Sequence, residues 1–432
     1  MYALLDANNF YASCEAALRP SLIGRPVCVL SNNDGCVIAR SEASKAMGVK
    51  MGQPYFEVRH LEAEGLVFLS PNFTLYGSMS DRVMSLAAAL GPSMERYSID
   101  EAFVSLHGVR GDQTKRARAI RARILQWTGI ACGVGIAQTK TLSKFANHVA
   151  KQADRKPGSY PREHAQVCNL GVLSRADVEE LLAATEVAEV WGVGRRIGEQ
   201  LRADGVMTAL DLARLDPAIV RRRWSVVLER TVRELQGESC IELEDAPPAK
   251  REIAVTRSFG HPVTDVEPLV EAVSTFASRA AEKLRKQSSV AGLVHVFAHT
   301  SPFRPGPRWA RSLSVPLRRP TADTAEITEA AVMGLRLMFE PGYMLAKAGV
   351  MLCDLSSELH QQCELDLEVE APVRDRSKLM KAMDQLNTRY GRGTLQVAAM
   401  GQQNQLQAWQ MRQERRTPHY TTDWRQIPIA RA

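Results

Sequence analysis

Two adjacent carboxylates, Asp100 and Glu101, stand inside the apolar, β-prone run YSIDEAFVSL at residues 97–106. Acidic side chains among buried apolar neighbours must be paired, exposed or bound to a cation. A second apolar run, YALLDANNFY at residues 2–11, carries one further acid, Asp6. Three carboxylates at the ends of two core strands suit a hard cation such as Mg²⁺, which takes oxygen ligands together with substrate phosphates. A lone Asp-Glu pair is more often a turn with solvated side chains, so the other elements must decide between the two interpretations.

The elements that position these acids are predicted from the spacing of apolar residues. The run at residues 2–11 predicts a strand that ends near Asp6, and the next segment predicts a helix at 10–18. Two short strands follow, joined by an Asn-Asn-Asp-Gly sequence that favours a hairpin turn. The further expected elements are a helix at 41–47, a helix at 76–90, a strand pair at 94–106, a helix at 112–127, a strand at 131–137 and a helix at 139–151. This order predicts a split β-α-β sandwich with residues 21–75 as an insertion.

A glycine-containing hairpin is predicted inside the helical stretch that covers residues 170–240. Gly192 and Gly194 stand between two amphipathic segments in the run VWGVGRRIGEQLRADGVMTALDL. A helix-hairpin-helix element of this kind binds a phosphate through backbone N–H groups and a helix N-terminus, without reading base sequence. An αα-hairpin that needs glycine only for its turn is the alternative.

A basic block is predicted within a second α+β domain. After an acidic, Pro-rich linker, residues 253–355 show the order strand, helix, strand, strand, helix, strand. Residues 251–319 hold eleven Lys or Arg against five Asp or Glu, which is nearly the whole net charge of +7. This is the usual footprint of phosphate-backbone binding, with Arg257 and Arg311 as candidate DNA contacts. The alternative is a solvated surface.

Bulk properties predict a cytoplasmic, soluble protein of several domains. A chain of 432 residues exceeds one ordinary domain. No signal peptide is evident, and no apolar stretch approaches the roughly 20 residues that span a membrane. The eight cysteines include no CxxC pair, which favours reduced thiols over disulfides or a zinc site.

Taken together, these motifs resemble the Y-family translesion DNA polymerases, and within them the UmuC type that supplies the catalytic subunit of DNA polymerase V. LLDANNFYASCE, YSIDEAFVSL and GVGIAQTKTLSKFANHVAK are similar to three motifs of that family in the same order. The resemblance implies an α+β, multi-domain, right-hand polymerase with a ferredoxin-like palm and a C-terminal tail. The implied parts are the palm at 1–20 and 76–168, small fingers at 21–75, a helical thumb at 169–241, a linker at 242–252, an α+β little finger at 253–355 and a partner-binding region at 356–432.

The resemblance also implies the roles of individual residues. Asp6, Asp100 and Glu101, with the backbone carbonyl of Ala7, would hold two Mg²⁺ ions for phosphoryl transfer. The residues implied in nucleotide binding are Phe10, Tyr11 as a steric gate against the ribose 2′-OH, Ser41, and Lys156 at the triphosphate. Where other branches place a Tyr and an Arg against the triphosphate, this chain has Ser41 and Ser44, and either Arg40 or Lys45 is expected to compensate.

The implied partners are primer-template DNA, dNTPs, a UmuD′-type accessory dimer and a RecA filament. The tail beyond residue 356 is expected to carry part of the accessory contact. A sliding-clamp motif is eroded, because Gln362, Leu365 and Leu367 fit its frame but Glu368 replaces the expected aromatic anchor.

The activity implied by the resemblance is error-prone, template-directed DNA synthesis across damaged bases in SOS mutagenesis. Two alternatives stay open at this point. One is a catalytically inactive DNA-binding scaffold on the same fold, and the other is a nucleotidyl cyclase, which also places paired acids on a split β-α-β palm.

Overall fold

The computed structural model describes residues 1–244, 246, 248–359, 375–401, 407, 409–427 and 429. The chain forms two compact units. The first unit contains Met1–Ser31, Gly35–Pro247 and Arg415–Ala432, and the second contains Asn32–Asp34 and Pro248–Glu414. The region predicted at 356–432 therefore contributes to both units. No helix among the described residues is long and apolar enough to cross a membrane.

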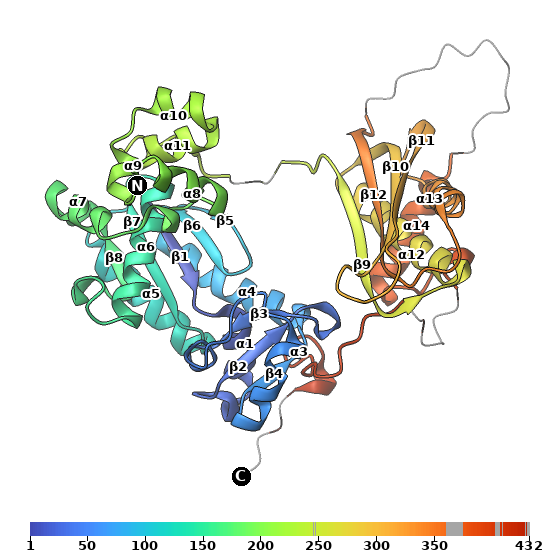
Figure 1. Cartoon of the computed structure of the whole chain (residues 1–432), viewed down its shortest axis with the longest axis horizontal. Helices are drawn as coiled ribbons and strands as arrows, with labels where there is room; N and C mark the ends of the chain where they lie inside the picture. The colour runs from blue at the N-terminus through green and yellow to red at the C-terminus, as the bar shows by residue number, and fades with distance from the viewer. Residues whose placement is uncertain are drawn as a thin grey trace. The chain divides into compact units, whose positions relative to one another are not determined.

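A five-stranded sheet with the order β5-β6-β1-β7-β8 is the centre of the first unit (Figure 1). Its central strand β1 pairs antiparallel with both β6 and β7, whereas β7 and β8 are parallel. The strands are β1 (Tyr2–Ala7), β5 (Ser93–Arg96), β6 (Glu101–Ser105), β7 (Cys132–Ala137) and β8 (Val167–Asn169). The predicted strand pair at 94–106 is confirmed, with Asp100 in its turn and Glu101 at the start of β6.

Helices cover both faces of this sheet. Ala3, Leu5 and Ala7 of β1 share a buried cluster with α4 (Phe73–Ala87) and α5 (Gln113–Thr128). The other face lies under α6 (Lys140–Arg155), where Gly133 and Gly135 of β7 allow the close approach. A Cβ at Gly135 would lie 2.2 Å from the backbone of α6. The glycines of the run CGVGIA are therefore required by helix packing.

A small second sheet follows the first helix of the unit. The helix α1 (Phe10–Leu18) leads into a sheet of order β3-β2-β4, which carries the short helices α2 and α3. The predicted hairpin is confirmed, since β2 and β3 pair antiparallel, and β2 also pairs in parallel with β4. The elements are β2 (Val27–Leu30), β3 (Val37–Arg40), α2 (Glu42–Ala46), α3 (Tyr55–Val58) and β4 (Val67–Leu69).

The predicted helical stretch at 170–240 is confirmed and packs on α6 through a shared apolar cluster. Its helices are α7 (Arg175–Ala183), α8 (Arg195–Ala203), α9 (Ala209–Ala213), α10 (Pro217–Arg223) and α11 (Val226–Leu235). The buried carboxylate of Glu234 on α11 accepts hydrogen bonds from the backbone N–H groups of Thr141, Cys240 and Ile241 at 2.8–3.0 Å. This carboxylate fixes the end of the helical stretch to the first turn of α6.

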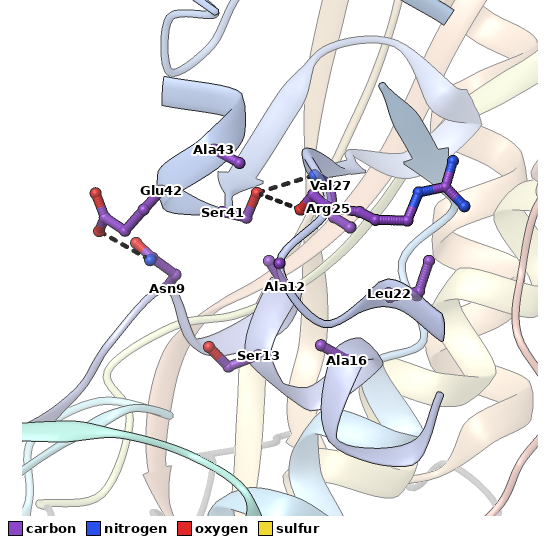
Figure 2. A pocket seen from close by; sticks show the side chains of 11 residues that line it. Asn9, Ala12, Ser13, Ala16, Leu22, Arg25, Val27, Ser41, Glu42 and Ala43 are labelled. Carbon is purple, nitrogen blue, oxygen red and sulfur yellow. Dashed lines mark hydrogen bonds between the residues drawn. The ribbon is translucent and has the colours of Figure 1, made fainter. Parts of the chain in front are cut away.

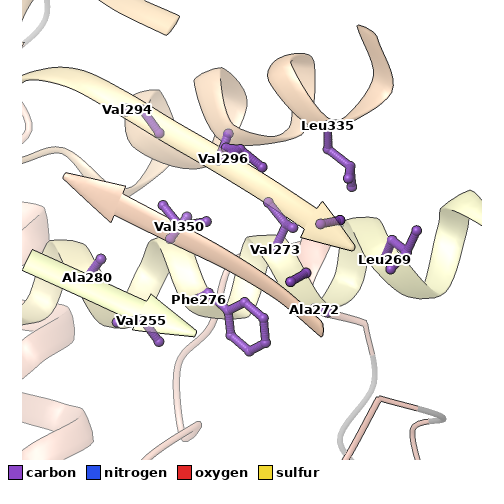
Figure 3. Close-up of a cluster of buried hydrophobic side chains, with 14 of the residues drawn as sticks. Val255, Leu269, Ala272, Val273, Phe276, Ala280, Val294, Val296, Leu335 and Val350 are labelled. Atoms are coloured by element: carbon purple, nitrogen blue, oxygen red, sulfur yellow. The ribbon is translucent and has the colours of Figure 1, made fainter. Parts of the chain in front are cut away.

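The second unit is an antiparallel sheet of order β11-β10-β12-β9 with two helices on one face. Alternate residues of the strands, including Val255, Val294, Val296 and Val350, meet Phe276 and its neighbours in one apolar core (Figure 3). The elements are β9 (Ile253–Val263), α12 (Val266–Lys286), β10 (Ser289–Thr300), β11 (Ala310–Thr321), α13 (Thr324–Met338) and β12 (Leu345–Ser357). The predicted α+β domain is confirmed, with longer strands than expected.

The helix α14 (Ser377–Tyr390) joins the helical layer of the second unit. Asp384 of α14 accepts two hydrogen bonds from the guanidinium of Arg285, both at 2.7 Å. Trp409 packs edge-to-face on Phe276, with ring centroids 5.8 Å apart. The C-terminal region thus completes the core of this unit.

Candidate active site

Asp6 and Glu101 lie directly opposite each other on the adjacent antiparallel strands β1 and β6. The Ala7 N–H donates to the Asp100 carbonyl at 2.9 Å, so the turn that carries Asp100 is fixed to the end of β1. Burial raises the pKa of Glu101, and the charge of Asp6 acts in the same direction. The structure therefore brings the acids of the two predicted strands together. Their adjacent negative charges need a positive group nearby.

Two lysines of α6 supply that charge. The Lys144 ammonium lies 3.0 Å from the Glu101 carboxylate, and the Lys151 ammonium lies 2.5 Å from that of Asp6. Between them on α6, the Asn147 amide donates to Asp6 at 3.2 Å. Sequence reasoning missed all three side chains. Lys144, Asn147 and Lys151 are three and four residues apart, which places them on one face of a helix and could have marked them as a group.

The oxygen donors of this site suit a divalent cation. Carboxylate oxygens are the ligands that Mg²⁺ prefers, and Asp6 and Glu101 present them side by side. No group of three or more acidic, His or Cys side chains among the described residues converges to hold an ion. The Asp100 carboxylate accepts from the Ser98 hydroxyl at 2.6 Å. The acids fit a cation once Lys144 and Lys151 release them.

Tyr11 lies at the edge of this site on α1. Burial raises the pKa of the Tyr11 hydroxyl, and the charge of Asp100 contributes. Its ring stacks on Tyr76 of α4, with centroids 4.4 Å apart and planes 16° from parallel, and meets the edge of Phe73 at 5.9 Å. The neighbouring Phe10 is buried in the apolar core. The predicted gate residue is thus half-buried and held by aromatic neighbours.

The hydroxyl groups of Ser41 and Ser44 bond to the backbone of the small sheet, and Figure 2 shows those bonds for Ser41. The Ser41 hydroxyl accepts from the Val27 N–H at 2.9 Å and caps α2. The buried Ser44 hydroxyl donates to the Val27 carbonyl at 3.1 Å. A pocket beside them is lined by α1 and the start of α2, including Asn9 and Glu42. The proposed phosphate contact of Ser41 stays a prediction.

Positive charge gathers around Glu42, one of the residues that line this pocket. The Lys45 ammonium donates to Glu42 at 2.9 Å and to Asn9 at 2.6 Å, and Arg155 of α6 lies 3.2 Å from Glu42. Lys156, the next residue, is exposed at the end of α6. The Arg40 guanidinium instead donates to the Val49 carbonyl at 2.6 Å. Lys45 thus contacts two residues that line the pocket, and compensation for the serines by Lys45 or Arg40 stays a prediction.

The predicted DNA contacts lie in separate parts of the chain. Gly192 has a φ of +91° and its Cβ position faces the Thr231 hydroxyl, so the turn itself requires glycine. Gly194 is the N-cap of α8. Arg257 and Arg311 follow the strand alternation of their apolar neighbours and lie toward the helical layer of the second unit. Their proposed contacts with DNA stay predictions.

The comparisons with known proteins cover the whole chain. The sequence model of the impB/mucB/samB family matches residues 5–148, and that of its C-terminal domain matches residues 250–365. The chain is 47% identical to Protein UmuC of Salmonella typhimurium, over 98% of each protein. The chain belongs to the impB/mucB/samB family. A further member, Protein MucB of Escherichia coli, is 42% identical over 100% of this chain and 99% of its own.

The fold of this family member is that of Y-family polymerases. A Y-family DNA polymerase chimera superimposes with a TM-score of 0.65 at 19% identity, covering 82% of this chain and 99% of that one. The more distant DNA polymerase IV of Moorella thermoacetica is 30% identical over 90% of this chain and 93% of its own. The expected UmuC-type resemblance and right-hand polymerase fold are therefore confirmed. Residues 377–430 match a domain of unknown function (DUF4113).

Proposed function

We propose that this member of the impB/mucB/samB family is an error-prone translesion DNA polymerase of SOS mutagenesis. It adds dNTPs to a primer 3′-OH opposite damaged template bases. The observation that carries this proposal is the pair Asp6 and Glu101, set opposite each other on a Y-family palm beside Asp100. The relatives named UmuC and DNA polymerase IV support it.

Asp6, Asp100, Glu101 and the carbonyl of Ala7 are the residues that would hold two Mg²⁺ ions. Such ions lower the pKa of the primer hydroxyl and neutralise the triphosphate when bound. Lys144 and Lys151 keep the acids charge-balanced in the free chain. Tyr11 excludes the ribose 2′-OH, and Lys45, Arg155 and Lys156 attract the triphosphate.

The thumb hairpin at Gly192 and Gly194 and the basic second unit hold the primer-template duplex through its phosphates. This contact is electrostatic and independent of base sequence. A UmuD′-type accessory dimer and a RecA filament are the proposed protein partners, with the accessory contact on the tail. The residues of the eroded clamp motif, Gln362, Leu365, Leu367 and Glu368, lie outside the described residues.

Primer extension by the Asp100→Asn variant tests the proposal. We expect wild-type protein to extend a primer past a template lesion in Mg²⁺ and the variant to lose extension while retaining duplex binding. The exposed Asp81, which pairs with Arg96 on the surface, provides the matched control Asp81→Asn. Extension by a pure Asp100→Asn protein would refute the assignment, and an inactive wild type that binds DNA would favour the scaffold alternative.

A further inference from the structure

A short C-terminal segment of the domain of unknown function returns to the first unit. We call this segment, Arg415–Tyr420, the strap. Figure 1 shows the red end of the chain beside α3 and β4. The Ser70 N–H donates to the Arg415 carbonyl at 3.2 Å, and the Arg415 N–H donates to the Ser70 hydroxyl at 2.9 Å. The strap is therefore attached by its backbone just before α4 begins.

Thr417 is the buried centre of the strap, with only 4% of its surface exposed. Its hydroxyl accepts from the Asn72 side-chain amide at 3.2 Å and donates to the Glu15 carboxylate at 3.2 Å. The Asn72 amide also donates to the carbonyls of Thr417 and Pro418, at 3.0 and 3.1 Å. The Asn72 side-chain oxygen caps α4 by accepting from the Leu75 N–H. One residue of the tail thus binds both α1 and the start of α4.

Glu15 connects Thr417 to the aromatic stack. The same carboxylate oxygen of Glu15 accepts from the Tyr76 hydroxyl at 2.7 Å, and its second oxygen has no hydrogen-bond partner in the described part of the chain. Glu15 follows Tyr11 by four residues on α1, so the two side chains share one helix face. Tyr76 meets both of them, with its hydroxyl on Glu15 and its ring on Tyr11.

We propose that the strap is a positioning element for Tyr11. Thr417 holds Glu15, Glu15 holds the Tyr76 hydroxyl, and the Tyr76 ring sets the plane of the Tyr11 ring. The inference rests on the proposed function, in which Tyr11 selects the sugar of the incoming nucleotide. Because none of Thr417, Glu15 and Tyr76 bonds the candidate metal ligands, the strap acts on sugar selection while the acids perform the chemistry.

Single-nucleotide insertion by the full-length chain tests this role. Thr417→Val removes the hydroxyl and keeps the shape of the side chain. We expect kcat/KM for a ribonucleotide to rise about fivefold, the effect of losing one hydrogen bond, while kcat/KM for the matching dNTP changes less than twofold. Thr417→Ser should restore discrimination, and Thr422→Val, at an exposed threonine of the same tail, should leave it unchanged.

Tyr76→Phe provides an independent second variant, because it keeps the stacked ring and loses only the hydroxyl. If both hydroxyls act through Glu15, the double variant will discriminate no worse than either single variant. Additive effects would overturn the inference, as would unchanged discrimination in a folded Thr417→Val protein. Those results require an active wild type. A wild type without nucleotide insertion would instead overturn the proposed function together with the inference.

Discussion

The ammonium of Lys151 on α6 lies 2.5 Å from a carboxylate oxygen of Asp6 on β1 of the five-stranded sheet. Both side chains are largely buried, so neither charge is well solvated. This ion pair occupies the Asp6 oxygen Oδ2, one of the oxygens that the proposed Mg²⁺ ions would take. Under the proposed function, cation binding and the lysine contact therefore compete for one carboxylate.

This competition predicts the effect of replacing Lys151. In the Lys151→Gln variant, a cation no longer displaces an ammonium, so we expect half-maximal primer extension at about threefold lower Mg²⁺, corresponding to a modest buried interaction. We also expect a lower unfolding temperature in EDTA, because Asp6 is left without its partner. A Mg²⁺ titration of extension and thermal unfolding measure the two effects. Lys115→Gln on the exposed side of α5 is the control, and an unchanged Mg²⁺ dependence would contradict the competition.

Glu15 predicts a pH dependence of stability. Burial raises the pKa of Glu15, and the hydrogen bonds from Tyr76 and Thr417 and the charge of Arg19 oppose this only partly. The folded chain therefore retains the proton to higher pH than the unfolded chain. The contribution of protonated Glu15 to the free energy of unfolding is fully present below the pKa that Glu15 has in the unfolded chain. It is lost as the pH rises through the higher pKa of Glu15 in the folded chain. Glu15→Gln cannot titrate, so we expect the stability difference between variant and wild type to move in favour of the variant from acidic to neutral pH. Urea unfolding at several pH values measures this, and parallel curves would contradict it.

Arg311 predicts the salt dependence of DNA binding. Its exposed guanidinium lies 3.7 Å from Glu340, which leaves it able to contact a phosphate. The slope of log affinity against log salt concentration is negative for DNA binding. We expect Arg311→Gln to make it shallower by about 0.9, the contribution of one phosphate contact. The control is Arg336→Gln, since Arg336 is paired with Glu267 at 2.9 Å in the same unit. Fluorescence anisotropy of a labelled duplex provides both slopes, and an unchanged slope in Arg311→Gln would exclude this residue as a contact.

Local sequence patterns predict most of the strands and helices, because the spacing of apolar residues and the residue types of turns depend on only a few neighbouring residues. The hairpin of β2 and β3 and the turn before Glu101 follow from such signals. Buried and exposed residues also alternate around Arg257, which lies two residues from both Val255 and Phe259 and therefore on the same face of β9. This alternation predicts that Arg257 lies on the face of β9 that packs on the helices, as the structure shows. Its contact with DNA stays a prediction.

Contacts between distant segments could not be predicted in the same way. The strap meets α4 across 345 residues of sequence, and no local pattern marks Thr417 as the partner of Asn72. The serines at 41 and 44 are similar, because their hydroxyls bond to Val27 in a neighbouring strand. Their roles depend on tertiary geometry, which periodicity does not contain.

The ion pair between Lys140 and Glu95 provides the last prediction. Only 2% of the Lys140 side chain is exposed, and its ammonium also donates to the Glu242 carbonyl at 2.6 Å. The Glu95 carboxylate accepts from the Glu244 N–H at 2.8 Å, so the pair attaches the segment after the helical stretch to β5 of the five-stranded sheet. Replacing Lys140 with Met leaves Glu95 buried without its counter-charge, and we expect a loss of about 3 kcal/mol in the free energy of unfolding.

The double variant Lys140→Met, Glu95→Gln separates charge from packing. Because the uncompensated carboxylate causes most of the expected loss, the second substitution should recover a large part of it. Urea unfolding of the single and double variants gives the coupling directly. If the double variant were less stable than Lys140→Met, the hydrogen bond that Glu95 accepts from the Glu244 N–H, rather than its charge, would dominate this contact.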